Sequence, residues 1–226
     1  MKQAIKAAWK LTVPIMAGYL FLGITFGFLM KDAGFPFWCP VVMSVIIYSG
    51  ALEFAAIPLL GAAFDPAGAF VMGLMISARH LFYGIPMLKK YENTGALKPF
   101  LIFALTDETF SVSSATEPPE GVERKRFYAA VSFLDHFYWI FGSAVGWLFG
   151  TLISFDVGGI DFALTALFIV LFIEQLTTKD GKVGGLIGFA ATALALILFG
   201  AERMVLFAML FILSALLLMK GVLSRE

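Results

Sequence analysis

The stretch "LTVPIMAGYLFLGITFGFLM", residues 11–30, runs for twenty residues without a charged side chain and decides the fold class. About twenty apolar residues cross the hydrocarbon core of a bilayer as an α-helix. The composition agrees, because 60% of the 226 residues are hydrophobic and only 14% are charged, whereas a soluble domain has about 25% charged residues. The sequence therefore predicts an integral membrane protein.

Further runs of this kind cover most of the chain. Residues 33–52, 137–155, 183–201 and 204–219 are uncharged, while 54–88, 99–116 and 162–178 are apolar but interrupted by charge. We expect helices throughout, because a backbone exposed to lipid must satisfy its own hydrogen bonds and because the runs lack the alternation of barrel strands. The prediction is an all-α membrane protein with about seven or eight membrane segments. The connections are short, so we expect a single transmembrane domain over residues 1–226.

Basic residues predict the orientation, because lysine and arginine gather in cytoplasmic loops. If every segment crosses the membrane, ten basic residues lie inside and five outside. If residues 33–64 and 99–116 are instead broken or re-entrant, the loop "KKYENTGALK" moves inside and the tally becomes thirteen against two. Both arrangements stay open from the sequence, and both put the N- and C-termini in the cytoplasm.

A glycine series occurs twice, at positions 18, 23 and 27 and at positions 142, 146 and 150, and each is followed by a lone glutamate, Glu53 or Glu174. Transporters are often built from two related halves with the site between them. Glycines at such spacing also allow close packing of membrane helices. Two related halves and simple close packing are both possible interpretations.

Six ionisable side chains fall inside or near these segments, where each costs about 2.5–3.5 kcal/mol near a helix centre. They are Glu53, Arg79, Asp107, Glu108, Asp135 and Glu174. Some can lie at segment ends or form structural ion pairs. The excess of acids over the single arginine also indicates carboxyl groups that hold and release protons. The candidate proton-coupling residues are Asp107, Glu108, Asp135, His136, His80 and Glu174, although His136 is equally a packing residue.

The stretch "SARHLFYG", residues 77–84, places an arginine and a histidine in an otherwise apolar run. Arg79 and Tyr83 are four residues apart and therefore lie on one side of a helix. A guanidinium within lipid needs an anionic partner or a water-filled cavity. That partner is either the carboxylate of a substrate or, in a structural salt bridge, Glu53 or Asp107.

The stretch "YSGALEF", residues 48–54, has three small residues in a row, which weaken a helix. A broken helix exposes amide and carbonyl groups that can bind the ends of an amino acid. A close helix crossing at Gly50 explains the same residues without a ligand. With a break, the candidate substrate-binding residues are Arg79, Tyr48, Ser49, Gly50, Ala51, Glu53 and Tyr83.

Several classes of function lack support in the sequence. Cys39 is the single cysteine and there are two histidines, so neither a disulfide nor a metal cluster is expected. No zinc-protease, nucleotide-binding or nucleophile-elbow motif occurs, so we expect no catalytic residues, no metal and no cofactor. An intramembrane enzyme built on Ser49 and His80 is a remote alternative. The net charge of zero does not indicate nucleic acid binding, and single, dispersed charges do not form the polar rings of a channel.

In this order along the chain, "PIMAGYLFLGITFG", "YSGALEF", "ARHLFYG", "LTDETF" and "LDHFYW" resemble the AzlC family. The resemblance implies the large subunit of a bacterial branched-chain amino acid exporter for leucine, isoleucine, valine and sometimes methionine. It also implies coupling to the proton gradient across the inner membrane and a small AzlD-type membrane subunit as partner. One position departs from the family pattern, since glutamine is common where this chain has Glu53. From the residues alone, the alternative is a transporter of another small zwitterionic or anionic solute.

Overall fold

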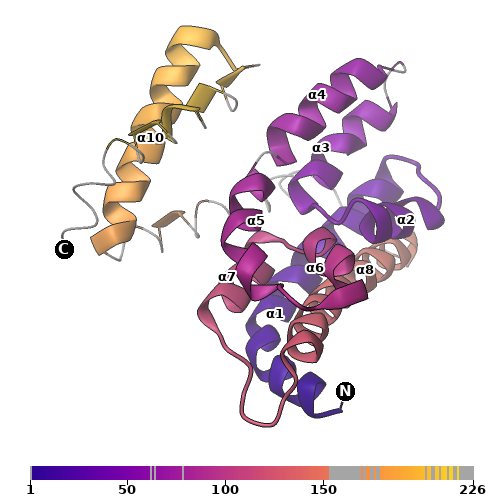
Figure 1. Cartoon of the computed structure of the whole chain (residues 1–226). Helices are drawn as coiled ribbons and strands as arrows, with labels where there is room; N and C mark the ends of the chain where they lie inside the picture. The colour runs from indigo at the N-terminus through magenta and orange to yellow at the C-terminus, as the bar shows by residue number, and fades with distance from the viewer. Residues whose placement is uncertain are drawn as a thin grey trace. The chain divides into compact units, whose positions relative to one another are not determined.

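The computed structural model describes residues 2–61, 63, 65–77, 79–152, 169, 172, 173, 176, 179–201, 203, 204, 207, 208, 210–212, 214, 215 and 218, without the side chains of residues 71, 75, 79, 81, 82 and 179–181. Every regular element in these residues is a helix (Figure 1). The chain forms two compact units, Met1–Asp161 and Phe162–Glu226. The all-helical part of the predicted fold class is confirmed for the described residues.

The first unit is built on a pair of long helices, α1 (Lys2–Asp32) and α8 (Arg124–Leu152). They pack side by side in parallel, since Gly23 of α1 lies against Trp139 of α8 and, further along both helices, Lys31 lies against Gly150. At about 1.5 Å per residue each helix is more than about 40 Å long, enough to cross a bilayer. The uncharged run at 11–30 lies within α1, as predicted.

Glycines let α1 and α8 approach closely. A Cβ atom added to Gly23 would lie 3.0 Å from the carbonyl oxygen of Trp139, and one added to Gly146 would lie 2.6 Å from Cα of Ile24. Gly23 and Gly27 of the first series therefore face the second helix of the pair at a close contact, whereas a Cβ atom on Gly18 would meet nothing within 4 Å. Close packing accounts for their spacing.

Both long helices begin at the same end of the unit, which we call the basic end. The basic residues there are Lys2, Lys6, Lys10, Arg124, Lys125 and Arg126. We call the other end, where Gly150 lies beside Lys31, the opposite end. Both arrangements derived from the sequence put these six basic residues on one side of the membrane, and the parallel packing agrees with them.

The chain after α1 forms a hairpin that enters from the opposite end and returns to it. α2 (Trp38–Ile46) starts near Trp147, whose Nε1 donates a hydrogen bond to the carbonyl of Phe35 at 2.8 Å. α3 (Gly50–Gly61) then runs back, so that Phe54 packs on the same cluster of apolar side chains as Met43 of α2. The segment predicted as broken or re-entrant at 33–64 is thus a hairpin of two short helices.

A second hairpin enters from the basic end. α4 (Pro66–Ser77) and α5 (Arg79–Lys90) lead to that end, and a 3-10 turn (Gly95–Leu97) precedes α6 (Lys98–Phe103) and α7 (Asp107–Ala115). Nζ of Lys90, at the end of α5, donates to the carbonyls of Ser113 (2.9 Å) and Ser114 (2.7 Å) at the end of α7. Nε of Arg124, at the start of α8, donates to the carbonyl of Lys90 at 3.2 Å. The chain therefore leaves the basic end through α6 and returns to it through α7.

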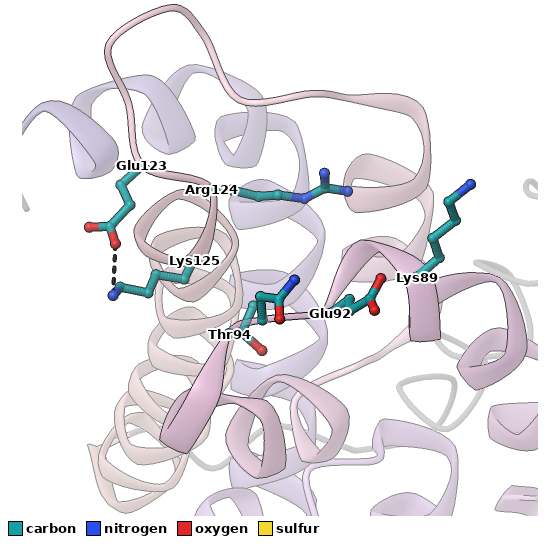
Figure 2. A pocket seen from close by; sticks show the side chains of 7 residues that line it. Lys89, Glu92, Thr94, Glu123, Arg124 and Lys125 are labelled. Atoms are coloured by element: carbon teal, nitrogen blue, oxygen red, sulfur yellow. Dashed lines mark ion pairs between the residues drawn. The ribbon is translucent and has the colours of Figure 1, made fainter.

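These contacts decide between the two arrangements derived from the sequence. The loops at 89–98 and 116–126 lie at the same end, and Figure 2 shows side chains of both around one pocket of about 270 Å³. If every segment crossed the membrane, the two loops would lie on opposite sides. That arrangement is wrong, and the one with broken segments at 33–64 and 99–116 agrees with the structure. Which end faces the cytoplasm stays a prediction.

In the second unit, the described residues include the long helix α10 (Lys179–Phe199), which matches the run predicted at 183–201. Within the described part of the chain, two helices are long and apolar enough to cross a membrane by length and composition, Lys2–Asp32 and Lys182–Phe199. The total of seven or eight membrane segments stays a prediction. Most of the run at 162–178 and part of the run at 204–219 lie outside the described residues.

Candidate functional site

The break in the first hairpin lies at "YSG", residues 48–50. α2 ends at Ile46 and α3 begins at Gly50. Tyr48 between them has a φ of 46°, in the left-handed region that few side chains adopt. A Cβ atom on Gly50 would lie 2.8 Å from the ring of Trp139. The predicted helix break is confirmed, and Gly50 also makes the close contact that was considered as its alternative.

The second hairpin breaks between Phe103 and Asp107. Thr106 caps α7, because its side-chain oxygen accepts a hydrogen bond from the backbone N–H of Thr109 at 3.2 Å. Each break thus leaves the N-terminus of a helix inside the unit, that of α3 in the first hairpin and that of α7 in the second. Helix N-termini carry partial positive charge and unpaired N–H groups, which favour anions.

The two breaks meet beside Tyr19 of α1. The ring of Tyr48 lies 6.5 Å from the ring of Tyr19 and 6.2 Å from that of Phe103, measured between centroids. The hydroxyl of Tyr19 also lies 2.5 Å from Oγ1 of Thr106. Two hairpins that enter from opposite ends therefore reach the same level of the unit.

Glu53 is fully buried in the first turn of α3. Its oxygens accept from the N–H of Ser49 (3.1 Å), from the hydroxyl of Ser44 (3.1 Å) and from Nε1 of Trp139 (3.1 and 3.2 Å). The hydroxyl of Ser44 lies 2.8 Å from that of Ser143, which donates to the carbonyl of Trp139 at 2.9 Å. Both carboxyl oxygens are therefore enclosed by donors of the protein itself.

A row of hydroxyl groups joins two further acids. Asp135 of α8 is fully buried, and its Oδ2 accepts from the hydroxyl of Thr109 at 2.8 Å. Oγ1 of Thr109 lies 3.0 Å from Oγ1 of Thr106, which contacts Tyr19 as described above. The hydroxyl of Tyr19 lies 2.8 Å from Oε2 of Glu108 in α7. Four hydrogen-bond contacts thus link Asp135 to Glu108.

Each of the two histidines has a ring nitrogen close to a backbone carbonyl oxygen. Nε2 of His136 lies 3.1 Å from the carbonyl oxygen of Ser44, and its ring centroid lies 4.3 Å from that of Tyr48. Nδ1 of His80 lies 3.0 Å from the carbonyl oxygen of Ser77. These contacts agree with the packing role considered for His136.

Some candidate residues lie away from the two breaks, and others lie outside the described residues. Arg79 begins α5, but its side chain lies outside the described residues, and so does Glu174 as a whole. The ring of Tyr83 stacks on that of Phe110 in α7, with centroids 4.9 Å apart. A site shared by Arg79 and the acids therefore stays a prediction.

A cavity of about 240 Å³ lies between α5 and α6. Most of its walls are apolar, and its lining includes Met87, Leu88, Ile102, Leu105, His80 and Lys98. Apolar walls with a few polar groups are typical of sites for small molecules.

The structure brings many of the predicted residues together. The first break collects the predicted substrate-binding residues Tyr48, Ser49, Gly50, Ala51 and Glu53. The proton-coupling candidates Glu108, Asp135 and His136 lie around the place where the breaks meet, and Asp107 begins α7 next to Glu108. Their roles stay predictions.

The sequence interpretation missed the neutral partners of the acids, which are Tyr19, Ser44, Thr106, Thr109 and Trp139. Thr106 had a signal, because a threonine directly before two acids, as in "TDET", is typical of a helix N-cap. The others had none, since a hydroxyl or an indole becomes a partner only when folding places an acid beside it.

Comparison with known proteins gives a consistent result. Residues 14–153 match the family model described as "AzlC protein". The chain is similar to the "Branched-chain amino acid transport protein AzlC" of Bacillus subtilis (strain 168), with 42% identity over 98% of this chain and 87% of that protein. It is 40% identical to an "Uncharacterized membrane protein" of Helicobacter pylori (strain ATCC 700392 / 26695) over 96% of both chains. It is 26% identical to "Inner membrane protein YgaZ" of Escherichia coli (strain K12) over 74% of this chain and 69% of that protein.

No solved structure matches this chain. The family match covers more than half of the sequence, and the resemblance noted from the motifs is confirmed. The names of the relatives indicate membrane and transport proteins and point away from an enzyme. The chain belongs to the AzlC family.

Proposed function

We propose that this protein is a secondary transporter that exports leucine, isoleucine and valine, with methionine as a further substrate, and is coupled to protons. The name of the Bacillus subtilis relative supports the substrate class. The observation that carries the proposal is the meeting of two broken helices around buried and partly buried acids, beside the paired helices α1 and α8. Transporters place substrate and ion sites at such discontinuous helices.

A branched-chain amino acid has three chemical features to recognise. Its carboxylate suits the helix N-termini at the two breaks, and Arg79 at the start of α5 is a second candidate. Its side chain suits apolar walls such as those of the cavity between α5 and α6. One buried methylene discriminates by only about 1–3 kcal/mol, so such a site would accept all four substrates.

The buried acids suit the ammonium group and the coupling protons. Glu53, Glu108 and Asp135 accept hydrogen bonds from neutral donors, whereas the ion pairs recorded for described side chains lie at the basic end. A carboxyl group held by neutral donors can change its charge without breaking an ion pair. Both oxygens of Glu53 are in use, so ammonium binding there requires one of its donors to move.

We also propose a small AzlD-type subunit as partner, the bacterial inner membrane as location and a cytoplasmic position for both termini. The basic residues at the start of α1 and α8 support this orientation. Phe133, Phe137 and Phe141 of α8 are exposed in the single chain and offer an apolar surface to lipid or to a second subunit.

Export of labelled leucine from cells tests the proposal, measured with and without the small subunit and over a range of external pH. We expect Arg79→Ala to abolish export while the protein still inserts into the membrane. Lys89→Ala is the matched control, because Lys89 is an exposed basic residue of the same helix.

Three results would contradict parts of the proposal. Normal export by Arg79→Ala would reduce this arginine to a structural role. Export that ignores external pH would remove the proton coupling. Transport of a different small zwitterion, with no leucine export, would favour the alternative substrate.

A further inference from the structure

The row of hydroxyl groups between Glu108 and Asp135 contains more contacts than it has protons of its own. The four contacts measure 2.8, 2.5, 3.0 and 2.8 Å, each within the range of an O–H···O hydrogen bond. Every such bond needs one proton. Tyr19, Thr106 and Thr109 supply one each, so three protons face four contacts when both acids are ionised.

One additional proton, held by either acid, completes the row. If Glu108 holds it, every group donates toward Asp135, and if Asp135 holds it, every group donates toward Glu108. Thr106 serves both directions, because the N–H of Thr109 fills one lone pair of its Oγ1 at 3.2 Å. Its remaining lone pair and its own proton are then left for its two neighbours in the row.

We propose that Glu108 and Asp135 share one proton and that Tyr19, Thr106 and Thr109 conduct it between them. Glu108 gives its proton to the hydroxyl of Tyr19, which releases its own to Thr106. Thr106 releases its proton to Thr109, and Thr109 releases its proton to Oδ2 of Asp135. Each hydroxyl ends with one proton, and one positive charge has moved. The inference rests on the proposed function, because it gives the coupling proton a path.

Three of the five groups in this path are buried, and Thr106 and Glu108 are partly exposed. Thr109 and Asp135 are fully buried, and Tyr19 is buried as well. Oδ1 of Asp135 is buried and has no hydrogen-bond partner among the described residues, so the row ends at this carboxyl group. Among the described side chains, the other titratable groups near the two acids are Asp107, Tyr48, Tyr91, Tyr138 and His136, none of which is a member of the row.

Proteoliposomes containing the export-competent protein allow two measurements. Leucine transport driven by an imposed pH gradient requires proton transfer, whereas exchange of labelled for unlabelled leucine at equal pH does not. We expect Tyr19→Phe and Thr109→Val to lower gradient-driven transport at least about tenfold, the size of a lost proton-transfer group, with exchange kept within about twofold. Thr109→Ser, which keeps the hydroxyl, should retain gradient-driven transport.

Matched controls come from a second tyrosine–threonine pair, which joins α1 to α8. The hydroxyls of Thr12 and Tyr138 contact each other at 3.1 Å outside the row, so Thr12→Val and Tyr138→Phe should leave coupling intact. Tyr19→Phe and Thr109→Val each interrupt the row, so the test can still be made if one of these two variants fails to fold. If the unaltered protein ignores the pH gradient, the proposed coupling fails and the path with it. If the unaltered protein responds, and Tyr19→Phe and Thr109→Val respond equally, only the path is refuted.

Discussion

Replacing Gly146 by alanine tests the contact between α1 and α8 that positions the candidate site. The added Cβ would lie 2.6 Å from both Cα and the carbonyl carbon of Ile24. These are backbone atoms of a long helix, so α1 must shift to make room. Forcing extra methyl groups into a packed interior costs about 1–3 kcal/mol. The better helix propensity of alanine returns about 0.8–1.0 kcal/mol. The free energy of unfolding of Gly146→Ala should therefore be lower than that of the unaltered protein by up to about 2 kcal/mol.

Gly18→Ala is the matched control. Gly18 also lies in α1, but a Cβ there would meet nothing within 4 Å. Only the better helix propensity of alanine then acts, so the free energy of unfolding of Gly18→Ala should rise by about 0.8–1.0 kcal/mol. Two substitutions of glycine by alanine in one helix pair are therefore expected to differ in sign. Gly27→Ala should behave like Gly146→Ala, because its Cβ would lie 2.7 Å from the backbone nitrogen of Trp147.

Thermal unfolding of the purified variants in detergent measures this difference. In a chain of this size 1 kcal/mol corresponds to about 2–4 °C, so Gly146→Ala should unfold about 2–12 °C below Gly18→Ala. Transport should fall with it, because the ring of Tyr19 on α1 packs 5.6 Å from that of Trp139 on α8. Equal unfolding temperatures for the two variants would refute the close contact of the helices at these glycines.

Two further predictions concern Glu53 and the basic end. Glu53→Gln should keep the fold, because an amide can accept from Trp139 through its oxygen and donate to Ser44 through its nitrogen. Glu53→Leu leaves buried donors unpaired at about 1–3 kcal/mol each, and equal thermal stability of the two variants would contradict the network. At the basic end, the hydrogen bond from Lys90 lowers the pKa of Glu117. This pair therefore stabilises the fold fully at a pH above the ordinary glutamate pKa. The stabilisation is lost as the pH falls through the lowered pKa of Glu117. Unfolding measured from about pH 6 to about pH 3 should show a smaller loss of stability for Glu117→Gln than for the unaltered protein, and parallel curves would exclude a contribution from the pair.

Part of the candidate site could be predicted because its signals are local. Three small residues at "YSG" weaken a helix wherever they occur, and the break is where they predict it. The acids stand out because a charge within an apolar run is costly in any fold. The choice between the two arrangements could not be made this way, since the tally of basic residues depends on which segments turn back. The contacts of Lys90 with the end of α7 decide it.

The sequence by itself determined that the chain is helical and suited to a membrane, because hydropathy is a sum over neighbouring residues. It also singled out Glu53 and Asp135, which the structure shows to be buried acids. Only the tertiary structure decided what holds them: Trp139 is 86 residues from Glu53, and Asp135 is 26 residues from Thr109. A hydrogen bond forms over about 3 Å between atoms that folding brings together. The hydropathy of a segment contains no information about which helix becomes its neighbour.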